Sequence, residues 1–100
     1  MSKQRERIEK MEAYLDEIRE TIDAFDEALE AYEKVQKKLA RLEKYYTGPS
    51  WIKDFEDYEK GKFPEDLKCG VLSEDAVYDV LTDKQDLMER MRKLTGSAGN

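Results

Sequence analysis

The feature that most constrains the fold is an apolar stripe in the first half of the chain. From Ile8 to Tyr32 apolar residues recur at alternating steps of three and four, and no glycine or proline interrupts residues 3–46. This spacing predicts one amphipathic α-helix over about residues 3–46. The stripe consists of Ile8, Met11, Leu15, Ile18, Ile22, Phe25, Leu29 and Tyr32.

The stripe is wider than the seam of a two-stranded coiled coil. Tyr14, Thr21 and Ala28 each stand directly before a stripe residue and are uncharged, so they broaden the apolar face toward the width typical of a helical bundle. After Tyr32 the next apolar residue is Val35, a step of three where four is due. Such a step overwinds a heptad seam locally, and the sequence leaves open whether the helix is continuous past Tyr32.

Three shorter helices are expected in the second half of the chain. A first helix over about 50–60 follows Gly48 and Pro49 and ends before Gly61. Ser73 can cap a second helix over 74–81, and the capping-box pattern from Thr82 to Gln85 predicts that a third helix begins at 83 and runs to 95. Residues 97–100 are expected to form a mobile tail.

A helix over residues 3–46 would span about 65 Å and cannot bury its own apolar face. The sequence therefore predicts an all-α single domain over residues 1–100, in which one long N-terminal helix is followed by three shorter helices folded back along it. Because two layers of helix still leave apolar surface outside, we expect self-association to complete a multi-helix bundle with coiled-coil packing.

The simplest assembly is a symmetric dimer. Between Met11 and Glu33 the chain carries nine acidic residues and only one basic residue, whereas Lys34–Lys44 is mainly basic. A parallel, in-register pair would set the acidic segments side by side, which like-charge repulsion opposes. An offset or antiparallel pair that brings the basic ends alongside the acidic middles is therefore expected.

Composition excludes several classes of function. The chain has no histidine, and its single cysteine and isolated glycines leave no common zinc site, catalytic triad or phosphate-binding loop. The net charge of −6 argues against binding to nucleic acid or to an acidic membrane surface, and no run of about 20 apolar residues could cross a bilayer. The single cysteine, Cys69, cannot form an internal disulfide bond, and the sequence has no signal-peptide pattern. Both observations predict a cytoplasmic protein.

Carboxylates are the only abundant reactive groups. Asp26, Glu27 and Glu30, followed by Asp54 and Asp57, faintly resemble the acidic signature of all-helical nucleotide pyrophosphohydrolases, which bind a divalent metal. The first three flank the stripe on its polar side, so a solvated helix surface is the favoured interpretation. The same acidic surface could instead imitate nucleic-acid phosphates and inhibit a basic partner.

An aromatic group surrounds the expected helix over 50–60. Trp51, Phe55 and Tyr58 share one of its faces, and Tyr45 precedes it. Aromatic residues dominate protein-binding surfaces, so these four are candidates for binding a partner. The alternative is an internal clasp that covers part of the first helix, and both interpretations stay open.

Four segments together resemble a small bacterial all-helical family described only as a domain of unknown function, DUF4298. The likeness extends over nearly the whole chain and is most specific in its last segment. It implies a bacterial helical protein with no assigned activity, and it supplies no catalytic residue. The segments are Met11–Asp16, Leu42–Tyr46, Trp51–Glu56 and Gly70–Asp83.

The sequence favours a non-catalytic protein–protein interaction or assembly module, without cofactor or metal. A second copy of the chain is the expected partner, and an unidentified protein is a further one. The alternatives are a divalent-metal-dependent phosphohydrolase that uses the carboxylates of the first helix, or an acidic inhibitor that mimics nucleic acid.

Overall fold

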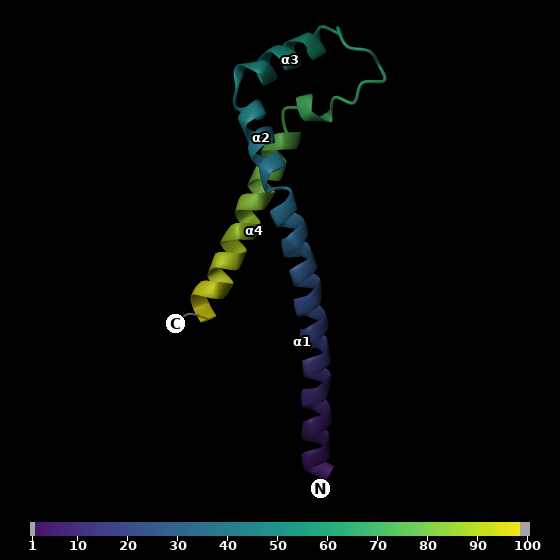
Figure 1. Cartoon of the computed structure of the whole chain (residues 1–100), viewed down its shortest axis with the longest axis vertical. Coiled ribbons are helices and arrows are strands. Elements are labelled where there is room, and N and C mark those ends of the chain that lie inside the picture. Colours follow the sequence, from purple (N-terminus) through teal and green to yellow (C-terminus); the bar gives the residue numbers. More distant parts are fainter. Residues whose placement is uncertain (1, 99–100) are drawn as a thin grey trace. The chain divides into compact units, whose positions relative to one another are not determined.

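The computed structural model describes residues 2–98, with side chains for residues 2–96. Over this range every regular element is helical, which confirms an all-α chain with a long N-terminal helix (Figure 1). Contacts divide the chain into two compact units, Met1–Lys37 and Lys38–Asn100. The single domain and the folding back of the shorter helices along the first stay predictions. The elements are α1 (Ser2–Lys34), α2 (Gln36–Tyr46), α3 (Pro49–Glu59), the short 3-10 helix η1 (Gly70–Leu72) and α4 (Ala76–Ala98).

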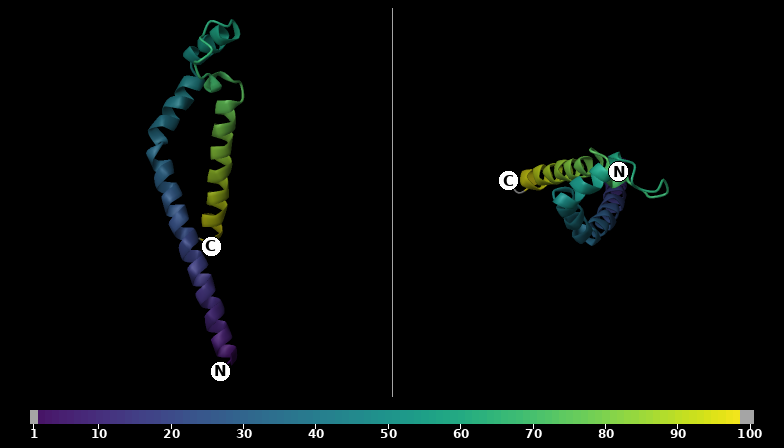
Figure 2. Two further views of the ribbon diagram at one scale, coloured as in Figure 1. Left: turned by 90° about the vertical axis from the view of Figure 1, so that its right-hand side faces the viewer. Right: turned by 90° about the horizontal axis from the view of Figure 1, so that it is seen from above.

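The helix α1 is long and uninterrupted (Figure 2). The expected helix over residues 3–46 is nevertheless wrong in one respect, because Val35 separates α1 from α2. The Val35 N–H donates to the Tyr32 carbonyl at 3.2 Å, three residues back, and the Gln36 side-chain amide donates to the same carbonyl at 3.0 Å. The interruption falls at the three-residue step in the apolar spacing, where a tighter turn keeps Val35 on the apolar side.

The turn between α2 and α3 depends on Gly48. This residue has an extended backbone (φ −105°, ψ 175°) and occupies the N-cap of α3, with Pro49 in the first turn. Gly48 therefore does not adopt the left-handed conformation that often ends a helix. Glycine is favoured here by close approach, since a Cβ atom at this position would lie 3.0 Å from the Lys44 carbonyl oxygen.

The end of α3 is set by Gly61, whose φ of 70° places it in the left-handed region. The Lys62 N–H donates to the Asp57 carbonyl at 3.1 Å, and the Gly61 N–H donates to the Tyr58 carbonyl at 3.0 Å. This pair of bonds is the Schellman motif, in which glycine avoids the steric cost that a Cβ atom would bring.

The C-terminal part differs from the sequence expectation. Ser73 does cap a helix, because its Oγ accepts a hydrogen bond from the Ala76 N–H at 3.0 Å. The two separate helices expected over 74–81 and 83–95 are one continuous helix, α4, which runs through Thr82 and Gly96. Ser97 and Ala98 also belong to α4, and residues 99–100 of the expected mobile tail lie outside the described residues.

The unit formed by residues 38–100 has a small hydrophobic core. Of its described residues, Leu72 in η1 and Val77 in α4 are the two with buried apolar side chains, with 5% and 2% of their surface exposed. The helix η1 contacts both α3 and α4, so a segment of only three residues connects two longer helices. The core sits where the chain passes from η1 into α4.

Candidate functional site

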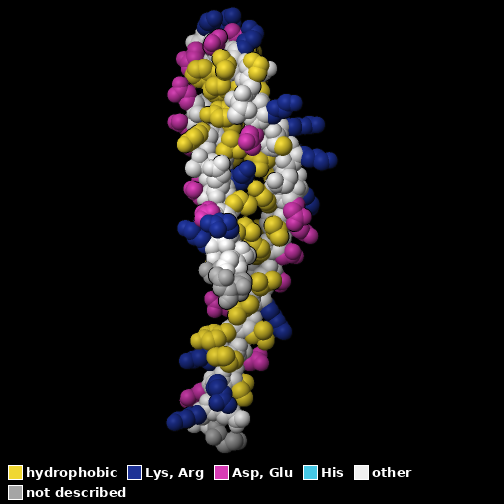
Figure 3. Space-filling view, turned by 90° about the vertical axis from the view of Figure 1, so that its left-hand side faces the viewer, with side chains coloured by type: hydrophobic (Ala, Val, Ile, Leu, Met, Phe, Trp, Pro, Cys, Tyr) yellow, Lys and Arg dark blue, Asp and Glu magenta, His cyan; other side chains and the backbone are white. Residues whose placement is uncertain are grey.

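The most prominent candidate site is the apolar face of α1, defined by the eight stripe residues from Ile8 to Tyr32. None of the residues of α1 is buried. Exposure of the large apolar side chains runs from 37% at Leu29 to 60% at Ile22, and Tyr32 is half-buried. Hydrophobic side chains are accordingly visible at the surface of this helix (Figure 3). An exposed apolar surface of this extent is typical of an interaction site.

A shallow hollow lies near the middle of this face. It has a volume of about 310 Å³, and α1 alone forms it. Residues one turn and two turns apart on a helix surround the kind of hole that receives a side chain from a facing helix. The lining residues are Tyr14, Glu17, Ile18, Thr21 and Ile22.

The aromatic residues predicted to bind a partner are held by internal contacts. Trp51 stacks on Phe55 with ring centroids 5.2 Å apart, and Tyr46 meets the Trp51 ring edge-on at 5.1 Å. The Trp51 Nε1–H donates to the Val71 carbonyl at 2.9 Å. These contacts favour the clasp interpretation, because they join α3 to η1 and to Tyr46 at the end of α2, within the range predicted for the first helix. Binding of a partner by these residues stays a prediction, and Tyr58 is the most exposed of them, at 46%.

Tyr45 and Tyr46 each make a polar contact within the 38–100 unit. The Tyr45 hydroxyl donates to a carboxylate oxygen of Asp54 at 2.6 Å, and the Tyr46 hydroxyl donates to the Glu74 carbonyl at 3.4 Å. Burial, followed by the hydrogen bond to Asp54, raises the pKa of Tyr45 from 10.0 to about 12. Both tyrosines are half-buried.

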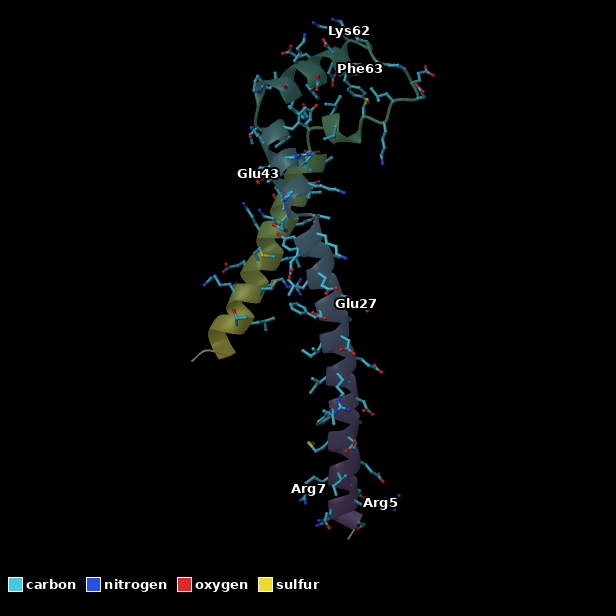
Figure 4. All side chains as sticks on the ribbon, viewed as in Figure 1. Arg5, Arg7, Glu27, Glu43, Lys62 and Phe63 are labelled. Carbon is cyan, nitrogen blue, oxygen red and sulfur yellow. The ribbon has the colours of Figure 1, made fainter. Side chains whose placement is uncertain are left out.

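A second hollow, of about 480 Å³, lies beneath the loop between α3 and η1. Cys69 lines it and is half-buried, and Phe63 stands on the loop that follows α3 (Figure 4). Tyr58, in α3, also lines it. The remaining lining residues are Gly61, Pro64, Glu65, Leu67, Gly70 and Ser73.

The carboxylates considered for a metal site have other partners or lie in solvent. Asp54 accepts the Tyr45 hydrogen bond, and Asp57 forms ion pairs with Lys53 at 3.8 Å and Lys62 at 3.4 Å. Asp26, Glu27 and Glu30 are exposed on α1, in the other unit. Among the residues that the structure describes, no group of three or more potential ligands is close enough to hold a metal ion.

These features define a class of small all-α proteins in which a long amphipathic helix exposes an apolar face. The chain belongs to the family described as a domain of unknown function (DUF4298), whose profile matches residues 8–94. The resemblance seen in the sequence is thus confirmed. No curated protein and no solved structure matches the chain. Within the described residues, no helix is long and apolar enough to cross a membrane.

Proposed function

We propose that this protein is a non-catalytic assembly module that binds a second copy of itself through the apolar face of α1. The observation that supports the proposal is the exposure of that face over a helix of 33 residues, none of which is buried. Amphipathic helices in proteins gain most of their stability by burying their apolar face. A second copy offers an identical face of the same length.

The gain from covering this face is large enough for a stable dimer. Burying a fully exposed aliphatic side chain contributes about 1.5–3 kcal/mol, so a side chain that is already half-covered contributes about 1 kcal/mol. Eight positions on each of two copies together contribute about 16 kcal/mol before the costs of association are subtracted. Association costs about 4–15 kcal/mol in lost translational and rotational freedom, and ordering of the interface side chains costs more, so the balance corresponds at best to a dimer of about micromolar affinity.

We also propose that the association takes place in a reducing, cytoplasmic compartment. The support for this is the cysteine content, because Cys69 is the one cysteine of the chain and has no partner for an internal disulfide bond.

Sedimentation velocity of the full chain tests the proposal. Protein concentrations from about one to one hundred micromolar bracket the micromolar dissociation constant that we expect. A monomer–dimer equilibrium is expected for the unmodified protein. Ile18→Glu places a charge in the apolar face and should yield a monomer. Ala13→Glu adds the same charge on the polar side of α1 and should leave the dimer intact. Monomer throughout for the unmodified protein, or equal effects of the two substitutions, would refute the proposal.

A further inference from the structure

The two edges of the α1 apolar face have opposite character. In heptad terms the stripe residues occupy the a and d positions, and the flanking positions are named e, after d, and g, before a. The g edge is uncharged throughout α1 from Tyr14 onward, and the e edge is charged throughout. The g edge comprises Tyr14, Thr21 and Ala28, and the e edge comprises Arg5, Glu12, Arg19, Asp26 and Glu33.

This asymmetry distinguishes the two ways in which a pair of α1 helices can pack. In a parallel pair each g residue faces an e residue of the other helix, so Tyr14 would face Arg19 and Ala28 would face Glu33. In an antiparallel pair the g edges face each other, and the e edges face each other on the opposite side. Only the antiparallel pair removes both uncharged edges from water together and leaves the charged edges near solvent.

The side chains of the stripe support the same orientation. A parallel pair stacks each residue on its own copy, which would place Phe25 on Phe25 and Tyr32 on Tyr32 at one end of the interface. Leucine at a with isoleucine at d, as in Leu15 and Ile18, also disfavours a two-stranded parallel pair. An antiparallel pair instead sets each a residue opposite a d residue, so a bulky side chain always meets an aliphatic one.

We propose that α1 pairs with α1 of a second copy in the antiparallel orientation, with Ile18 of each copy opposite Ile22 of the other. The proposal rests on the self-association proposed above and adds its orientation and register. This register uses all eight stripe positions, and it keeps the two acidic segments opposite each other, unlike the offset pair that charge alone favours. Its layers are Ile18 with Ile22, Leu15 with Phe25, Met11 with Leu29, and Ile8 with Tyr32.

The hollow on α1 lies at the centre of this register. Ile18 and Ile22 both line it, and the two-fold axis of the antiparallel pair passes close to them. In this register Ile22 and Thr21 of the other copy lie over the hollow, and Glu17 forms its outer rim. Each copy then presents the same surface to the other, as a symmetric dimer requires.

Charge separates the two orientations at the edges of the face. Arg5 and Arg7 lie near the N-terminal end of α1 (Figure 4). In the antiparallel register Arg5 is placed beside Glu33 of the second copy, an attractive contact, whereas Glu12 beside Asp26 and Arg19 beside Arg19 are repulsive contacts. In a parallel pair Glu12 would instead lie beside Arg7, an attractive contact. The sign of the interaction at Glu12 therefore reports the orientation.

Cross-linking tests the orientation in a Cys69→Ser background. Thr21→Cys brings two thiols together only in the antiparallel pair, because parallel helices carry their g edges on opposite sides of the interface. Ile8→Cys brings two thiols together only in the parallel pair, because the antiparallel register separates the two positions by about 36 Å. A short bifunctional maleimide should cross-link the Thr21→Cys protein and not the Ile8→Cys protein. Cross-linking of the second protein, or of neither, would overturn the orientation.

A charge reversal gives an independent measurement of the same orientation. Glu12→Lys turns two repulsive contacts with Asp26 into attractive ones, and should lower the dissociation constant about tenfold. Glu27→Lys changes the net charge equally on the outer side of α1 and should act much less. If Glu12→Lys raises the dissociation constant relative to this control, the antiparallel orientation is wrong.

These experiments separate the orientation from the association itself. A parallel dimer cross-links through Ile8→Cys and still sediments as a dimer, which refutes the orientation and leaves the assembly module. A protein that sediments as a monomer at every concentration refutes both. Circular dichroism of each variant should serve as the control that the helices remain.

Discussion

The core of the 38–100 unit can be tested by removing the same atoms from a buried and from an exposed position of one helix. Val77 is 2% exposed and Val80 is 49% exposed, and both belong to α4. Replacing either valine by alanine removes two methyl groups and raises helix propensity by about 0.5 kcal/mol. Only the first substitution also leaves a cavity in the core.

The expected difference follows from burial. Each buried carbon contributes about 0.8 kcal/mol, and the cavity adds a further cost. The free energy of unfolding of Val77→Ala should therefore be about 2 kcal/mol lower than that of Val80→Ala. Urea unfolding should be followed by the fluorescence of Trp51, the one tryptophan of the chain, which contacts η1. For a unit of this size the m value in urea is about 1 kcal/mol/M. The difference in unfolding free energy therefore corresponds to urea midpoints about 2 M apart. Equal midpoints for the two variants would refute the assigned core.

Three further predictions concern the 38–100 unit. Because the pKa of Tyr45 is raised from 10.0 to about 12, its stabilising contribution should be complete below pH 10 and disappear as the pH rises from 10 to 12. Absorbance titration should detect its ionisation near the upper end of this range, and Asp54→Asn should make it ionise earlier. Gly61→Ala forces an alanine to a φ of 70° and should cost about 1–2 kcal/mol in urea unfolding, whereas Gly61→Asn should cost less. Trp51→Phe leaves the Val71 carbonyl without its donor and should lower the thermal midpoint by several degrees; an unchanged midpoint would show that the hydrogen bond contributes nothing.

The sequence predicts helices well where a periodic signal is long. Twenty-five residues of regular spacing define α1, and the single irregular step, from Tyr32 to Val35, coincides with the interruption of the helix. The residues that bound α3 also predicted its ends. Pro49 begins the helix, and Gly61, just after it, has the one positive φ among the described residues. Such signals act through local sterics, so they do not depend on tertiary contacts.

Local signals failed where two of them compete. Thr82 and Gln85 match a capping box, yet no glycine or proline stands between Ala76 and Thr95, and helix propagation through this range is favourable. Thr82 is half-buried within α4. A cap pattern therefore marks a helix start only where something also ends the preceding helix.

The two candidate sites differ in the same way, because local signals predict one of them and not the other. The apolar face of α1 follows from periodicity alone, whereas the role of Trp51 depends on a carbonyl twenty residues away, at Val71. Aromatic content identified Trp51 and Phe55 as important but could not distinguish a partner surface from an internal contact. The 3-10 helix that carries Val71 has no periodic signal, because three residues do not complete an amphipathic repeat.

The most direct test of the assembly proposal is amide hydrogen exchange along α1 of the full chain, measured over a range of protein concentrations. If a second copy covers the apolar face, protection across Leu15–Leu29 should rise with concentration and follow the dissociation constant from sedimentation, while protection around Val77 stays constant. Protection of α1 that does not change with concentration, over a range in which the protein remains monomeric, would contradict the account.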